Sequence, residues 1–105
     1  MIEFKKTRQE KNIFTFTAFE NEKEKGFCRF SIDGYNTFLL QAESEDELIK
    51  EGLIRASLNF AANRGCYMAR CEGSVCPNIL KKMHFEGEKE LSCDIPTALT
   101  GSLCG

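Results

Sequence analysis

Six cysteines are the residues of this sequence best able to do chemistry: Cys28, Cys66, Cys71, Cys76, Cys93 and Cys104. No two of them form the C-x-x-C pair that is typical of zinc sites, and the single histidine, His84, is not spaced as a fourth ligand. Four of the six fall within or beside expected strands, where a thiol packs as a small hydrophobic group. We therefore expect reduced cysteines that mostly belong to the core, and no metal.

Cys76 differs from the other cysteines because it directly precedes Pro77. Proline is favoured at the first position of a helix, so the segment PNILKKMH predicts a short helix that begins there. A thiol at a helix N-terminus commonly has a lowered pKa and a larger thiolate fraction. Cys76 is therefore a candidate catalytic nucleophile, and the alternative is a cysteine that stands at a helix start without a chemical role.

A second stretch with chemical potential is SEDELIKEG, residues 44–52, at the expected start of the longest helix. Backbone N–H groups at a helix N-terminus bind phosphates unless side chains of the chain itself cap them. Ser44 and Glu47 have the S-x-x-E spacing of a capping box. Three more carboxylates crowd the same place and would repel a phosphate: Glu43, Glu45 and Asp46. The pattern favours a capped helix over an anion site.

The elements that must position these residues follow a definite order. Segments 12–19, 25–32 and 35–42 alternate in polarity with the period of strands, and Asp33-Gly34 is a strong hairpin signal between the last two. They predict an antiparallel meander, after a short edge strand at 1–6 and a turn at 7–12. The periodicity then becomes that of an amphipathic helix, which should end near Asn63 with Gly65 just beyond it.

The C-terminal part predicts a strand, a helix and a second strand. CYMARC should lie parallel to the strand before the long helix, because a helical crossover joins them. The segment GEKELSCDI predicts a closing strand that Pro96 ends, and residues 96–105 show no readable pattern. We expect an α+β fold with a mixed, mainly antiparallel sheet flanked by two helices, as a single domain over 1–105 with its core at 12–95.

Composition and charge exclude several classes of protein. Fourteen basic and sixteen acidic residues leave a formal net charge of −2, which is too balanced for binding to the phosphate backbone of nucleic acid. No apolar run approaches the roughly 20 residues of a membrane span. The first residues, MIEFKKTRQEK, lack the apolar core of a signal peptide, so we expect a cytoplasmic protein with no membrane contact.

The order of elements over residues 12–95 resembles that of the GNAT superfamily of acyl-CoA N-acyltransferases. FLLQAES resembles the family's strand and turn LAVDPEY, LIRASLNFAANRG resembles its helix LLEALLEYAREQG, and ILKKMHFE resembles its LYEKLGFE. The resemblance implies a GNAT-like sheet, acetyl-CoA or coenzyme A as a ligand, and transfer of an acyl group to an amine.

The resemblance also implies where such a ligand would bind. In the family, the strand before the long helix hydrogen-bonds the pantetheine arm, which corresponds to Phe38 and Leu40. The family's pyrophosphate loop, R/Q-x-x-G-x-G/A, falls on residues 45–50 when the helices are matched without gaps. This places Leu48, Ile49 and Lys50 among the expected cofactor-binding residues.

The chain departs from the family pattern at its chemical positions. Leu48 and Lys50 replace the two glycines of the loop, and Glu45 replaces its basic or amide residue. Leu80 stands where the family often has a tyrosine that serves as the acid and protonates the departing thiolate. Gly73 stands where the family has an asparagine. Residues 6–12 also leave no room for the one or two helices that family members insert between their first two strands.

Three hypotheses remain from the sequence. The first is a GNAT-like binding or interaction module with a degenerate acetyl-CoA site, which we expect to form a homodimer because a shortened sheet leaves surface uncovered. The second is a functional minimal N-acetyltransferase that binds acyl-CoA. The third is a thiol-reactive protein that acts through Cys76.

Overall fold

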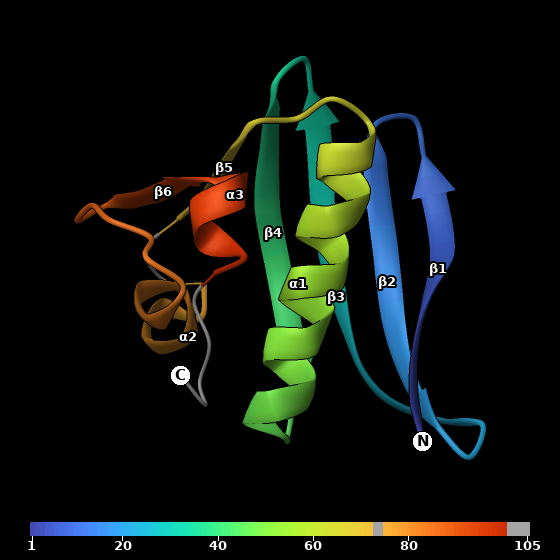
Figure 1. Ribbon diagram of the computed structural model, residues 1–105. Helices are drawn as coiled ribbons and strands as arrows, with labels where there is room; N and C mark the ends of the chain where they lie inside the picture. Colours follow the sequence, from blue (N-terminus) through green and yellow to red (C-terminus); the bar gives the residue numbers. More distant parts are fainter. Residues whose placement is uncertain (73–74, 101–105) are drawn as a thin grey trace.

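A computed structural model, which describes residues 1–72 and 75–100, contains one six-stranded sheet in the order β1-β2-β3-β4-β5-β6 (Figure 1). All neighbouring strands are antiparallel except β4 and β5, which are parallel. The expected α+β fold with a mixed, mainly antiparallel sheet is therefore confirmed. The strands are β1 (Ile2–Glu10), β2 (Ile13–Glu20), β3 (Lys23–Asp33), β4 (Asn36–Ser44), β5 (Met68–Glu72) and β6 (Glu90–Asp94). The helices are α1 (Glu47–Asn63), α2 (Pro77–Lys82) and α3 (Ile95–Ala98).

The predicted meander is confirmed, but the edge strand before it is longer than the sequence indicated. β1 runs to Glu10, so the turn expected at 7–12 is wrong, and the connection to β2 is the tight turn at Lys11 and Asn12. The register shifts between Lys6 and Arg8, and the Thr7 hydroxyl lies 2.8 Å from that of Thr17. Because nearly all of this edge strand is exposed, its second half carries no apolar alternation that would have identified it.

Helix α1 packs across β2, β3 and β4 through an aromatic cluster. The ring of Phe60 lies between 5.0 and 5.9 Å from the rings of Phe14, Phe16 and Phe30. Leu53, Ile54, Leu58 and Ala61 of α1 are fully buried. Gly65 follows the helix with φ of 96°, a left-handed conformation that glycine adopts without steric cost, which confirms the expected helix end.

The C-terminal segment contains a helix that the sequence did not reveal. Residues 96–105 were expected to have no pattern, but α3 begins at Ile95, and the Asp94 carboxylate accepts a hydrogen bond of 2.9 Å from the Thr97 N–H. Ile95 and Ala98 are buried, and the Arg55 guanidinium donates to the Leu99 carbonyl at 2.7 Å. A four-residue helix shows too little periodicity to be read from sequence.

The closing strand is also shorter than expected, since β6 begins at Glu90.

All three helices lie on one face of the sheet. The buried strand residues, such as Phe30, Leu39, Cys71 and Leu91, form a single hydrophobic core together with residues of α1, α2 and α3. Figure 1 shows α1 and α3 in front of the sheet. Within residues 1–72 and 75–100, no helix is both long and apolar enough to cross a bilayer.

The burial of α3 gives a direct test of this packing. Ile95→Ala should lower the free energy of unfolding by about 2 to 5 kcal/mol, because it removes methyl groups from a closed core. Lys89→Ala, which changes an exposed side chain of the preceding loop, should stay within about 0.5 kcal/mol of the wild type. Urea denaturation measures both, and equal effects of the two substitutions would show that α3 is not docked.

Candidate functional site

A small cavity opens where β4 and β5 diverge. Their parallel register ends at the pair Leu39 and Cys71. On the other side of β4, Phe30 pairs with Leu39 and Arg29 with Gln41, so Leu40 is the extra residue of a bulge. The cavity has a volume of about 250 Å³ and is lined by Leu40, Gln41, Ala42, Glu43, Lys50, Val75 and Cys76. It therefore joins β4, the first turn of α1 and the residues before α2.

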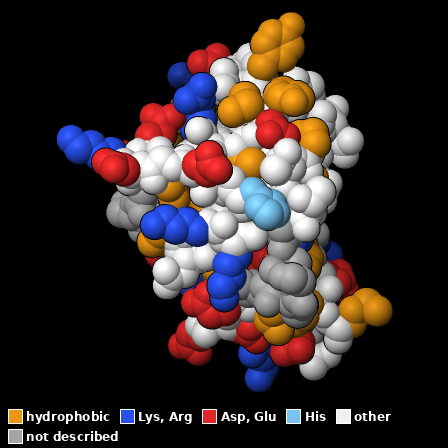
Figure 2. All heavy atoms as spheres, turned by 60° about the vertical axis from the view of Figure 1, so that its left-hand side comes forward, with side chains coloured by type: hydrophobic (Ala, Val, Ile, Leu, Met, Phe, Trp, Pro, Cys, Tyr) orange, Lys and Arg blue, Asp and Glu red, His pale blue; other side chains and the backbone are white. Residues whose placement is uncertain are grey.

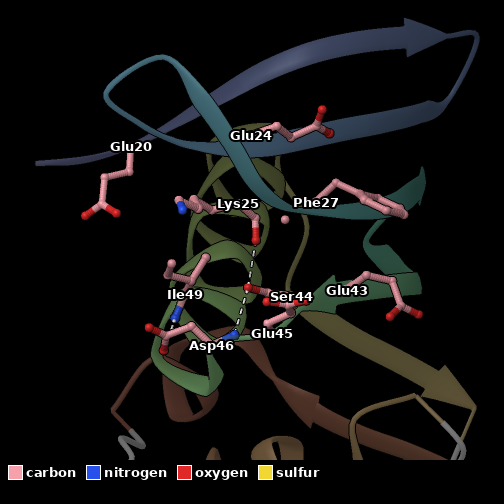
Figure 3. Close-up of a pocket in the computed structure, with 10 residues that line it drawn as sticks. Glu20, Glu24, Lys25, Phe27, Glu43, Ser44, Glu45, Asp46 and Ile49 are labelled. Carbon is pink, nitrogen blue, oxygen red and sulfur yellow. Dashed lines mark hydrogen bonds between the residues drawn. The ribbon is translucent and has the colours of Figure 1, made fainter.

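The start of α1 is capped by Asp46. Its Oδ1 accepts hydrogen bonds from the N–H groups of Leu48, at 2.8 Å, and Ile49, at 3.4 Å. The expected capping box of Ser44 and Glu47 is therefore wrong. Ser44 ends β4, so its hydroxyl instead donates to the Lys25 carbonyl of β3 at 2.8 Å and accepts from the Asp46 N–H at 3.2 Å (Figure 3). The helix start is capped as expected, but by a different residue.

Carboxylates surround this capped helix start. A hollow of about 700 Å³ lies beside it, and Figure 3 shows the side chains of β2, β3, β4 and α1 around it. Its lining includes one lysine, Lys25, and five acidic residues: Glu20, Glu24, Glu43, Glu45 and Asp46. The field of these charges opposes the approach of a phosphate, and two of the N–H donors that a phosphate would use are already bonded to Asp46.

The thiol of Cys76 lies in the β4–β5 cavity but is not activated. Its Sγ donates a weak hydrogen bond to the Ala42 carbonyl at 3.6 Å, and it makes no capping bond to α2. Burial raises the pKa of Cys76; the charge of Lys50 opposes this rise, and the carboxylates of Glu43 and Glu47 add to it. The expected lowering of the pKa is therefore wrong, because burial outweighs the dipole of a six-residue helix.

The other described cysteines behave as core residues, as expected. Cys28, Cys66, Cys71 and Cys93 are buried and free. Burial raises the pKa of Cys28 and of Cys71 to about 12. Cys104 lies outside the described residues. In the part of the chain that the structure describes, no three His, Cys, Asp or Glu side chains are grouped to hold a metal ion, and the single histidine, His84, lies at the surface (Figure 2).

The structure brings together only part of the predicted cofactor-binding set. Leu40 and Lys50 line the cavity with Cys76, and the Lys50 ammonium lies 4.0 Å from the Glu47 carboxylate. Leu48 is 58% exposed. Ile49 lines the acidic hollow instead of the cavity. Phe38 pairs with Ser31 and Arg70, and it lies on the sheet face that points away from the helices.

The sequence did not indicate Gln41, Ala42 and Val75, which line the cavity, and it placed Asp46 at the helix start without identifying it as the cap. Asp46 did carry a signal, because aspartate is among the best N-cap residues, but Ser44 offered an equally good cap two residues earlier. Position 80, where the family often has its acid, is a fully buried leucine. Gly73, at the family's asparagine position, lies outside the described residues.

Comparison with solved structures identifies the fold. The chain superposes on a protein from Desulfovibrio desulfuricans assigned to the GNAT family of acetyltransferases, with a TM-score of 0.72 and 8% identity over 80% of this chain and 70% of that one. It is also similar to the ribosomal-protein-S18-alanine N-acetyltransferase of Escherichia coli, with a TM-score of 0.71 and 12% identity over 83% and 72% of the two chains. This chain thus has the fold of GNAT acetyltransferases.

A third similar structure is PaiA N-acetyltransferase from Thermoplasma acidophilum, determined in complex with coenzyme A. Its TM-score is 0.66 and its identity 14%, over 79% of this chain and 61% of that one. No family model matches the sequence, and no curated protein matches it. The resemblance drawn from the sequence is confirmed at the level of the fold.

The cap assignment predicts a clear order among substitutions at the start of α1. Asp46→Ala should lower the free energy of unfolding by about 1 kcal/mol, because the Leu48 and Ile49 N–H groups lose their acceptor. Asp46→Asn should retain most of the stability, since asparagine caps equally well. Glu47→Ala, which removes the acceptor that a capping box would need, should cost less than Asp46→Ala. Chemical denaturation measures the three variants, and a loss in Glu47→Ala as large as that in Asp46→Ala would restore the capping box.

The environment of Cys76 predicts a slow thiol. Since its pKa is raised, its thiolate should be scarce at neutral pH, and its alkylation by iodoacetamide should accelerate only in alkaline solution. Lys50→Ala should slow the reaction further, whereas Lys25→Ala should not change it. Mass spectrometry of the labelled peptide measures the rate, and labelling at neutral pH as fast as that of a free cysteine peptide would contradict the expected result.

Proposed function

We propose that this protein is a GNAT-fold binding module whose acetyl-CoA site is degenerate, and not an efficient acyltransferase. The observation that carries the proposal is the bond between the Asp46 carboxylate and the N–H groups of Leu48 and Ile49. Those donors lie on the stretch that the family resemblance assigns to pyrophosphate binding. A charge-assisted bond within the chain satisfies them without a ligand.

Two features of the β4–β5 cavity support the same proposal. The Ala42 carbonyl, on the part of β4 beyond its pairing with β5, already accepts a bond from the Cys76 thiol. The volume of about 250 Å³ is below the roughly 300 to 1,000 Å³ of typical small-molecule sites. These features support a site in which two amide donors at the start of α1 are bonded within the chain and the neighbouring cavity is smaller than a typical small-molecule site.

A functional N-acetyltransferase that uses acetyl-CoA is the second candidate. It is supported by the divergence of β4 and β5, by the cavity between them and by the fold shared with a protein that was solved with coenzyme A. The third hypothesis, a protein that reacts through Cys76, is the least supported of the three, because burial raises the pKa of that thiol and its Sγ is bonded to the Ala42 carbonyl.

As a binding module, the protein is proposed to act through contacts with other protein chains and to form a homodimer. Several expectations from the sequence remain predictions: a cytoplasmic location, the absence of nucleic-acid, membrane and metal partners, and a single domain over residues 1–105.

Thermal melting with and without acetyl-CoA separates the first two candidates. A ligand at about 100 times its dissociation constant adds roughly 2.7 kcal/mol, which is a rise of roughly 10 °C or more in a domain of this size. We expect no rise for the wild-type protein with millimolar acetyl-CoA. Asp46→Gly should show a rise, because it frees the Leu48 and Ile49 N–H groups, and glycine at an N-cap costs only a few tenths of a kcal/mol.

Asp94→Gly is the matched control, since it removes the corresponding cap of α3 away from the site. It should melt at the same temperature with and without acetyl-CoA. A rise in the wild-type protein would favour the acetyltransferase. Equal behaviour of the two glycine variants would show that Asp46 is not what blocks the ligand.

A further inference from the structure

The sheet face opposite the helices carries large apolar side chains that belong to no core. Ile13, Phe19, Phe27 and Phe38 are only half-buried, and none of them packs against the hydrophobic core. Their neighbours along the strands, such as Phe14, Phe16 and Cys28, point the other way and are buried. No helix of residues 1–72 and 75–100 covers this face, because all three pack on the opposite one.

The strand registers place these side chains in rows across β2, β3 and β4. Thr17, Phe27 and Glu43 form one row. The next row is Thr15, Arg29 and Gln41, and a third contains Ile13, Ser31 and Phe38. Phe27 and Arg29 therefore lie side by side on the central strand, at the edge of a hollow of about 500 Å³ that both of them line. We call these three rows the open face.

The open face carries two residues of opposite charge. Arg29 and Glu43 are exposed, and neither forms an ion pair with any residue of the described ranges. Phe27 and Arg29 of β3 pair with Glu43 and Gln41 of β4, so the four side chains form a square. Arg29 and Glu43 occupy two opposite corners of that square. Figure 3 shows Phe27 and Glu43 pointing to the same side of the sheet. When a second copy of this face is turned by 180° and laid on the first, the positive charge of each copy lies opposite the negative charge of the other. The face is therefore complementary to itself.

We propose that the open face binds a second copy of this chain in a two-fold symmetric dimer. In such an interface residue i contacts residue j and j contacts i, so Arg29 of each chain would pair with Glu43 of the other. Phe27 and Phe38 would be buried at the centre, where aromatic residues and arginine commonly provide most of the binding energy. The inference rests on the proposed function, because it names the partner and the surface of the binding module.

The dimensions of the molecule suit such an interface. It measures 36 × 32 × 22 Å, and the sheet spans its broad side, so the open face is large enough for the roughly 800 Å² per partner of a standard interface. Two sheets that pack face to face lie about 10 Å apart, a distance that apolar side chains of this size fill. The dimer would then have four layers, with helices on the outside and two sheets within.

The free edge of the sheet is a poor alternative for association. β1 presents Lys5, Lys6 and Arg8, and its register shifts between Lys6 and Arg8. Lysine and an irregular register are features that prevent strands of two molecules from pairing at an edge. The charges of Lys5 and Arg8 are already paired with Glu3 and Glu10 of the same strand, whereas the open face offers charges of opposite sign that form no ion pair within the described residues.

Charge reversal tests the interface. Sedimentation at several concentrations should show a dimer for the wild-type chain. Arg29→Glu and Glu43→Arg should each weaken dimerisation at least tenfold, because each places like charges opposite one another. The double variant, Arg29→Glu with Glu43→Arg, should recover most of the wild-type affinity. Lys82→Glu, an exposed charge reversal on α2, should leave the dimer unchanged.

A wild-type chain that stays monomeric, or a double variant that is no tighter than the single ones, would overturn the inference. Capture of a different protein by the open face in place of a second copy would also overturn it. Circular dichroism of every variant controls for folding. Melting with acetyl-CoA, applied to the monomeric Arg29→Glu variant, keeps the two proposals separate, because its outcome depends on Asp46 and not on the dimer.

Discussion

The contact of Phe60 with Phe14, Phe16 and Phe30 fixes the position of α1 across the sheet, and the rest of the structure depends on it. Aromatic rings at these separations favour tilted and edge-to-face geometries and bury large apolar areas. The Arg64 guanidinium lies 4.7 Å from the centre of the Phe60 ring and covers it from the solvent side. With α1 held at this end, its first turn lies beside the end of β4.

The placement of α1 determines what its first turn can bind, and the short connection between β1 and β2 determines which face of the sheet is covered. The first turn of α1 meets the β4–β5 cavity with its amide donors already bonded to the Asp46 carboxylate. The tight turn at Lys11 and Asn12 meanwhile joins β1 to β2 without helices, and all described helices pack on one side of the sheet. The start of α1 therefore has two of its amide donors bonded within the chain, and the described helices leave the opposite face of the sheet uncovered.

The sequence predicted those parts of the fold whose side chains alternate between core and solvent. The meander, the crossover helix and the parallel strand all have one buried face, and their periodicity shows it. The second half of β1 has no buried face, and α3, with four residues, covers only about one helical turn, so neither could be found from periodicity. In the site, the acidic character of the α1 start was evident, but the choice between Ser44 and Asp46 depended on where β4 ends. The pKa of Cys76 depended on burial, which the residues adjacent in sequence do not reveal.

Amide NMR during titration with coenzyme A can show whether the Asp46 carboxylate keeps the amide donors at the start of α1. We expect that the Leu48 and Ile49 resonances of the wild-type protein do not move as the ligand is added. A saturable shift of these two amides would show instead that a diphosphate displaces the carboxylate.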